Sequence, residues 1–121
     1  MSKLPREEWR AFFEKLTHEY EGYDVTIEVV SKEFGDQFEA ERLPLTYLGY
    51  DDKDDVFIVA VGGTDSRYQA VLRHMIEHPK AIYAEPLAGE TPWAIDVIGP
   101  DETQTIVSVR MRPALPPPEE E

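Results

Sequence analysis

A single change in the spacing of the apolar residues constrains the fold of this chain more than any other feature of its sequence. Between Leu4 and Tyr20 the apolar side chains recur at helical spacing, and charged residues fall on the opposite side. From Tyr23 onward the spacing becomes two, in short runs separated by turn-forming residues. One helix followed by hairpin-spaced strands is typical of an α+β domain.

The N-terminal helix has a clear beginning and end. Pro5 suits the first helical turn, and Gly22 can adopt the left-handed conformation that ends a helix. About six short strands are expected after it, the second with a bend or edge at Pro44, which lacks a backbone donor. They fall at residues 23–31, 37–48, 56–61, 81–85, 93–98 and 105–111. We predict that the amphipathic helix packs on a bent antiparallel sheet or small barrel.

The segment from Ser66 to His78 is ambiguous. Its apolar residues fit one face of a helix, but one face of a strand would also hold Leu72, His74, Ile76 and His78. We favour the helix and keep the strand as the alternative. Pro79 limits either element, because it disfavours helical geometry in the residue before it.

Composition places the chain among small soluble proteins. Its 121 residues fit a single globular domain at 1–112, followed by a Pro/Glu-rich disordered tail at 113–121. No apolar run reaches the roughly 20 residues of a membrane span, and no signal peptide is recognisable, so a cytoplasmic location is expected. Cysteine is absent, which excludes disulfides and thiolate sites. The net charge of −13 makes nucleic-acid binding unlikely.

The sharpest chemical pattern is the H-x-x-E-H sequence at residues 74–78. In inverted zinc peptidases this pattern places two imidazoles around a metal, with the carboxylate as base. Here His74 and His78 would be the ligands, Glu77 the base and Glu85 a third ligand. The helix would have to continue through the second histidine, which Pro79 opposes. We therefore expect surface histidines and assign no catalytic, cofactor or metal-binding residue.

A partner-binding segment is suggested around Pro44. The proline-limited edge would leave backbone groups free to pair with a strand of another protein. Glu39, Glu41, Leu43 and Leu45 are the candidate contact residues.

Three separated motifs resemble a known bacterial family. They are Pro5-Arg6-Glu7-Glu8-Trp9 with Phe12-Phe13, then the run from Glu39 to Leu45, then His74-x-Ile76-x-x-Pro79. In this order they resemble Domain of Unknown Function 5335, over about residues 5–113. The resemblance implies a small, soluble, stand-alone bacterial protein and confers no activity.

These observations lead to a function defined only by class. We expect a non-enzymatic cytoplasmic binding or accessory domain, with an unknown protein as its partner. A small metal-dependent hydrolase using residues 74–78 is one alternative, and an oligomeric Sm-like barrel subunit is another. The oligomeric state stays open.

Overall fold

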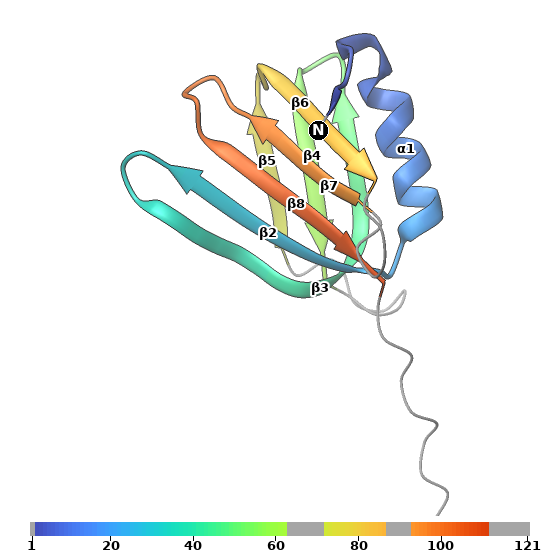
Figure 1. The fold of residues 1–121 in the computed structure, drawn as a ribbon. Helices are drawn as coiled ribbons and strands as arrows, with labels where there is room; N and C mark the ends of the chain where they lie inside the picture. The colour runs from blue at the N-terminus through green and yellow to red at the C-terminus, as the bar shows by residue number, and fades with distance from the viewer. Residues whose placement is uncertain (1, 63–71, 87–92, 112–121) are drawn as a thin grey trace, which may run out of the picture.

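The computed structural model describes residues 2–62, 72–86 and 93–111, which form one helix, one short 3-10 turn and an eight-stranded antiparallel sheet. The strand order is β1-β6-β7-β8-β2-β3-β4-β5 (Figure 1). The elements are β1 (Ser2–Lys3), η1 (Arg6–Glu8), α1 (Trp9–Tyr20), β2 (Asp24–Ser31), β3 (Gly35–Asp51), β4 (Val56–Val61), β5 (Leu72–Glu77), β6 (Ala81–Pro86), β7 (Trp93–Ile98) and β8 (Gln104–Arg110). The α+β class is as predicted, and the predicted tail at 113–121 lies outside the described residues.

The long strand β3 divides the sheet into two layers. Its first part pairs with β2 as far as Pro44, whereas its second part pairs with β4 from Leu45 onward. Between the two parts Arg42 has a positive φ of 54°, and the register of both pairings shifts close to this point. The strand bends here, so that β4 and β5 lie behind the layer of β6, β7, β8 and β2 (Figure 1).

The sheet does not close into a barrel. Its order ends at β1 on one side and at β5 on the other. The prediction of a small barrel with about six strands is therefore wrong in two respects: the described residues form eight strands, and the sheet stays open. The two-residue strand β1 was too short to be seen in the spacing of apolar residues.

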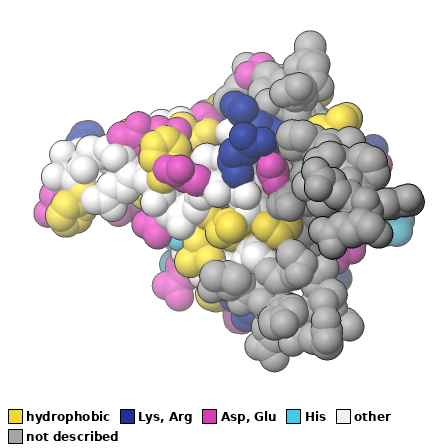
Figure 2. Space-filling view, turned by 90° about the horizontal axis from the view of Figure 1, so that it is seen from below, with side chains coloured by type: hydrophobic (Ala, Val, Ile, Leu, Met, Phe, Trp, Pro, Cys, Tyr) yellow, Lys and Arg dark blue, Asp and Glu magenta, His cyan; other side chains and the backbone are white. Residues whose placement is uncertain are grey.

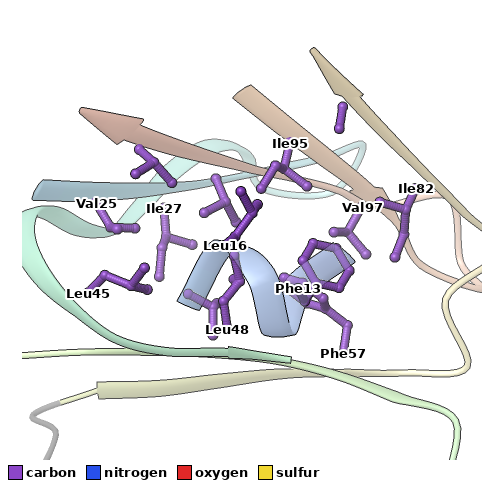
Figure 3. Packing of buried hydrophobic residues seen from close by; sticks show 14 of the residues in the cluster. Phe13, Leu16, Val25, Ile27, Leu45, Leu48, Phe57, Ile82, Ile95 and Val97 are labelled. Carbon is purple, nitrogen blue, oxygen red and sulfur yellow. The ribbon is translucent and has the colours of Figure 1, made fainter. Parts of the chain in front are cut away.

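The helix α1 covers one side of the space between the two layers (Figure 1). Its buried residues are Trp9, Phe13 and Leu16, and they belong to one continuous apolar core (Figure 3). Phe13 stacks edge-on against Phe57 of β4 at 5.2 Å between ring centroids, and Phe12 does so against Trp93 of β7 at 5.1 Å. One helix face thus contacts both layers, which explains its aromatic content. No helix among the described residues is long and apolar enough to cross a membrane.

The favoured helix at residues 66–78 is wrong where the structure describes it. Leu72–Glu77 is the strand β5, and residues 66–71 lie outside the described part of the chain. β5 pairs in regular antiparallel register with the apolar strand β4, from Val56 opposite Glu77 to Val61 opposite Leu72. Pairing with this neighbour decides between two periodicities that the local sequence leaves equal.

Candidate functional site

The β2–β3 hairpin projects to one side of the molecule (Figure 2). We call residues 28–41 the arm. Because β4 pairs with β3 only from Leu45 onward, the arm has no strand on the far side of β3 among the described residues. Two large apolar side chains are exposed on it, Phe34 at 70% and Phe38 at 54%. Exposed apolar groups on an unpaired edge are typical of a contact surface.

Acidic side chains accompany these phenylalanines. Glu28 and Asp36 lie close enough for their carboxyl groups to share a hydrogen bond, which raises the pKa of Glu28 above its ordinary value. Glu39 and Glu41 are exposed farther along β3. The arm is therefore acidic as well as apolar.

The four predicted contact residues are not equivalent in the structure. Glu39 and Glu41 are exposed in the part of β3 that pairs with β2 alone. Leu43 is half-buried, and Leu45 is 2% exposed in the core, where it pairs with Val61. The bend of β3 separates them: residues before it stay accessible, and residues after it enter the second layer.

A hollow of about 350 Å³ lies between β5 and the inner faces of β2 and β8. We call it the groove. Its walls include His74 and Ile76 from β5, and Val29 and Thr105 from the opposite layer. Asp101, in the turn between β7 and β8, lies at one end. The groove exists because β5 is the last strand of the sheet and the layers are not joined there.

His74 is the titratable group inside the groove. The side chain is half-buried, and this burial lowers the pKa of His74 below its ordinary value, while the charge of Glu39 acts in the opposite direction. At neutral pH the imidazole is uncharged, so one ring nitrogen can donate a hydrogen bond and the other can accept one.

The residues of the H-x-x-E-H pattern do not come together as a metal site. His74 faces the groove, whereas His78 is exposed beyond the end of β5 and directs Nδ1 to Asp55 Oδ2 at 3.1 Å. Glu77 is exposed, and Glu85 lies on β6 in the other layer. No group of three or more His, Asp or Glu side chains that could hold a metal exists within the described ranges.

A second polar cluster, centred on Asp55, was missed by sequence reasoning. Tyr50 donates its hydroxyl hydrogen to Asp55 Oδ1 at 2.5 Å, and Arg6 Nη1 donates to the same oxygen at 3.1 Å. The hydrogen bond from Tyr50 is the main reason that the pKa of Asp55 lies below its ordinary value. Burial chiefly raises the pKa of Tyr50. Arg6 also donates to the carbonyl oxygen of Pro79 at 3.0 Å, so the cluster fastens the N-terminal segment to the ends of β4 and β5.

This cluster brings together two of the motifs singled out in the sequence. Arg6 and Trp9 belong to the first motif, and Pro79 ends the third. The Arg6 guanidinium carbon lies 4.3 Å from the centre of the Trp9 ring. A histidine oriented by an aspartate can serve as the base for a nucleophilic hydroxyl, and His78 and Asp55 form a pair of this kind. The hydroxyl in contact with Asp55 is that of Tyr50, however, and it donates its hydrogen to the carboxylate. The cluster therefore has the geometry of a structural contact that connects the N-terminal segment to the ends of β4 and β5.

Comparison with known proteins agrees with the resemblance of these motifs. Residues 1–118 match the family of unknown function DUF5335. The chain belongs to this family. A relative in Aquifex aeolicus (strain VF5), described as an uncharacterized protein, is 39% identical over 116 residues, which cover 96% of each chain. No solved structure matches the chain. Membership of DUF5335 brings no activity with it, so a functional assignment depends on the groove, the arm and the charges around them.

Proposed function

We propose that this DUF5335 chain is a non-enzymatic binding domain that holds an extended, basic and apolar segment of a partner protein in the groove. The observation that carries the proposal is the edge of β5 beside the groove, which pairs with no further strand among the described residues. The proposal narrows the expectation of a binding or accessory domain to one surface and one kind of ligand.

The backbone of β5 can pair with a further strand. All six residues of β5 pair with β4 on one side, and no other strand in the described part of the chain pairs with β5. An extended peptide can add to such an edge as a further antiparallel or parallel strand, with main-chain hydrogen bonds that do not depend on sequence. Alternate side chains of the added strand would then point into the groove.

The walls of the groove combine apolar side chains with a hydrogen-bonding group. Val29 and Ile76 provide apolar contact for a branched or aromatic side chain. The neutral imidazole of His74 provides a hydrogen-bonding group at mid-groove. A few placed polar groups among apolar walls are the usual composition of a recognition pocket.

The carboxylates around the groove favour a basic ligand. Asp101 and Glu77 line the groove, and Glu39 lies close enough to influence His74. Together with the net charge of −13, these carboxylates favour a segment that carries Lys or Arg and accelerate its association at low salt. The other expected classes have less support: the described residues hold no metal ligand set, and the sheet is not the closed barrel of an Sm-like subunit.

Selection from a phage library of ten-residue peptides tests the proposal. Val29→Lys places a cation in the groove, whereas Val30→Lys makes the same change on the opposite face of β2. We expect peptides in which Lys or Arg alternates with apolar residues, bound at least tenfold more weakly by Val29→Lys and within about twofold by Val30→Lys. Tenfold weaker binding by Val29→Lys corresponds to a loss of about 1.4 kcal/mol or more in the free energy of binding.

The selected peptide must also change the backbone amide NMR signals of β5. Peptides that bind both variants equally, or that shift signals elsewhere in the molecule, would place binding on another surface. If no peptide were enriched on the wild-type protein relative to Val29→Lys, the result would count against a peptide-binding function.

A further inference from the structure

A second hollow of about 350 Å³ lies where the N-terminal segment pairs with the beginning of β6, and it shares no lining residue with the groove. Its lining contains three cationic side chains, Lys3, Arg6 and Lys80, and no carboxylate. The remaining walls are Leu4, Pro5 and Trp9. We call it the cationic hollow.

This composition is unusual for so acidic a chain. The protein has 12 Lys and Arg residues against 25 Asp and Glu residues, so a random patch of surface is more often acidic than basic. The neighbouring hollow on the other side of Arg6 shows the ordinary composition, since Glu7 and Asp52 line it beside Arg10. Three cations in one hollow without an acidic wall therefore require an explanation.

Two of the three cations, Arg6 and Lys80, are held in place by contacts outside the hollow. Arg6 is fixed against the Trp9 ring and uses three of its five N–H donors on Tyr50, Asp55 and Pro79, which leaves two donors. Lys80 forms an ion pair with Glu102 in the β7–β8 turn and retains further ammonium protons.

Lys3 is the least compensated of the three. It lies on β1 opposite Tyr83, and no ion pair of its side chain is formed with another described residue. The two carboxylates on Asp55 and Glu102 offset two of the three positive charges, so the hollow keeps an excess of one. Arg6 and Lys80 are positioned by their contacts before a ligand arrives and therefore lose little entropy on binding.

We propose that the cationic hollow binds a small oxyanion, the phosphate or carboxylate group of a low-molecular-weight compound. The anion accepts hydrogen bonds from the free donors of Arg6, Lys3 and Lys80, and the rest of the compound lies against Pro5 and Leu4. This site does not depend on the peptide-binding proposal, because no residue lines both hollows.

NMR titration of the full chain with sodium phosphate, and separately with sodium acetate, tests the site at constant ionic strength set with chloride. The two tryptophans give an internal comparison. The Trp9 indole N–H donates to the carbonyl oxygen of Leu4 at 3.0 Å, in the wall of the hollow, whereas Trp93 packs on Phe12 and does not line it. We expect a saturable shift of the Trp9 indole signal and none of the Trp93 signal.

Variants decide whether the shift comes from the hollow. Lys3→Ala with Lys80→Ala should weaken binding about tenfold or more, because two charge-assisted contacts are lost. Lys15→Ala with Lys53→Ala removes the same charge from exposed positions outside the hollow and should change binding less than twofold. Both double variants keep Arg6, whose removal would disturb the fold.

Each outcome has a defined meaning. Saturation with phosphate alone assigns a phosphate-bearing ligand, and saturation with both anions assigns the broader oxyanion class. Absence of a saturable Trp9 shift with either anion, or equal weakening by the two double variants, would overturn the site.

Discussion

Asp55 and His78 share an uncommon backbone conformation and also contact each other. Their φ angles are +57° and +55°, in the left-handed region that most non-glycine residues avoid. The amide N–H of His78 donates to the carbonyl oxygen of Asp55 at 2.7 Å, and their side chains form a second contact. Two left-handed residues thus end the β4–β5 pairing together, and the hydrogen bonds around Asp55 compensate for the conformational cost.

Replacement of Asp55 by Asn tests the importance of its charge. Asn tolerates the left-handed region, so the backbone conformation is retained. At pH 7 we expect a loss of about 1–2 kcal/mol in the free energy of unfolding, because Tyr50 and Arg6 lose a charged acceptor. Asp52→Asn, which alters an exposed ion pair with Arg10, should cost less than about 0.5 kcal/mol.

The pH dependence of this loss has a defined sign. The folded pKa of Asp55 is lowered, so its contribution is complete above the unfolded pKa of about 3.9 and disappears as the pH falls through the folded value. Urea unfolding at pH 7 and at pH 2.5 should therefore show a smaller difference between wild type and Asp55→Asn at the lower pH. An equal difference at both pH values would mean that Asp55→Asn destabilises the protein by altering the shape of the side chain and not by removing its charge.

Single residues could be predicted only in part. The sequence pattern identified His74 and His78 as alternative ligands of one shared metal site, although surface histidines were expected. Their separation follows from the strand, which turns His74 into the groove, and from the contact of His78 with Asp55, 23 residues away. Contacts of this range depend on the completed fold and leave no local signal.

At the level of elements, the outcome depended on what each segment packs against. The strands β4 and β7 were predicted with the bounds that the structure shows. The helix was expected from Leu4 to Tyr20, and it begins only at Trp9, after the 3-10 turn Arg6–Glu8. β5 was assigned to a helix because its own sequence fits both periods. β3 was expected to bend at Pro44, and the bend is present, but the strand continues through it into the second layer.

The free side of the arm has a measurable consequence in hydrogen exchange. β4 lies between β3 and β5, so its amide protons should exchange slowly. In β3, residues 36–43 pair with β2 alone, and about half of their amides should exchange rapidly because they point away from β2. Amide exchange followed by NMR at low protein concentration distinguishes the two strands.

A concentration series provides the control for this measurement. Protection of residues 36–43 that increases with protein concentration would show that a second copy pairs with the arm. Uniform slow exchange at every concentration would contradict the free edge itself.

For the whole molecule, the decisive feature is that one core joins an open sheet and a single helix. The buried cluster includes residues of α1 and of strands in both layers. The sequence predicted that a helix covers a bent sheet, because an amphipathic helix must bury its apolar face. It could not predict that the helix covers one side of the space between two layers, since this depends on where the long strand β3 bends.

Phe13 is the residue through which this arrangement can be tested. It is fully buried on α1 and contacts Phe57 of the rear layer. Phe13→Ala should lower the free energy of unfolding by about 3–5 kcal/mol, a large part of the roughly 5–15 kcal/mol typical of a domain. Phe38→Ala, the same change on the exposed arm, should alter it by less than about 0.5 kcal/mol.

Two probes in urea unfolding show whether the layers lose structure together. Tryptophan fluorescence reports on Trp9 and Trp93, which lie on α1 and β7, and far-ultraviolet circular dichroism reports on the whole backbone. Because both layers share the core around α1, the two transitions should coincide in the wild type and move together in Phe13→Ala. If the fluorescence transition of Phe13→Ala preceded the backbone transition, the sheet would be stable without the helix, and the helix would be a cover and not part of the common core.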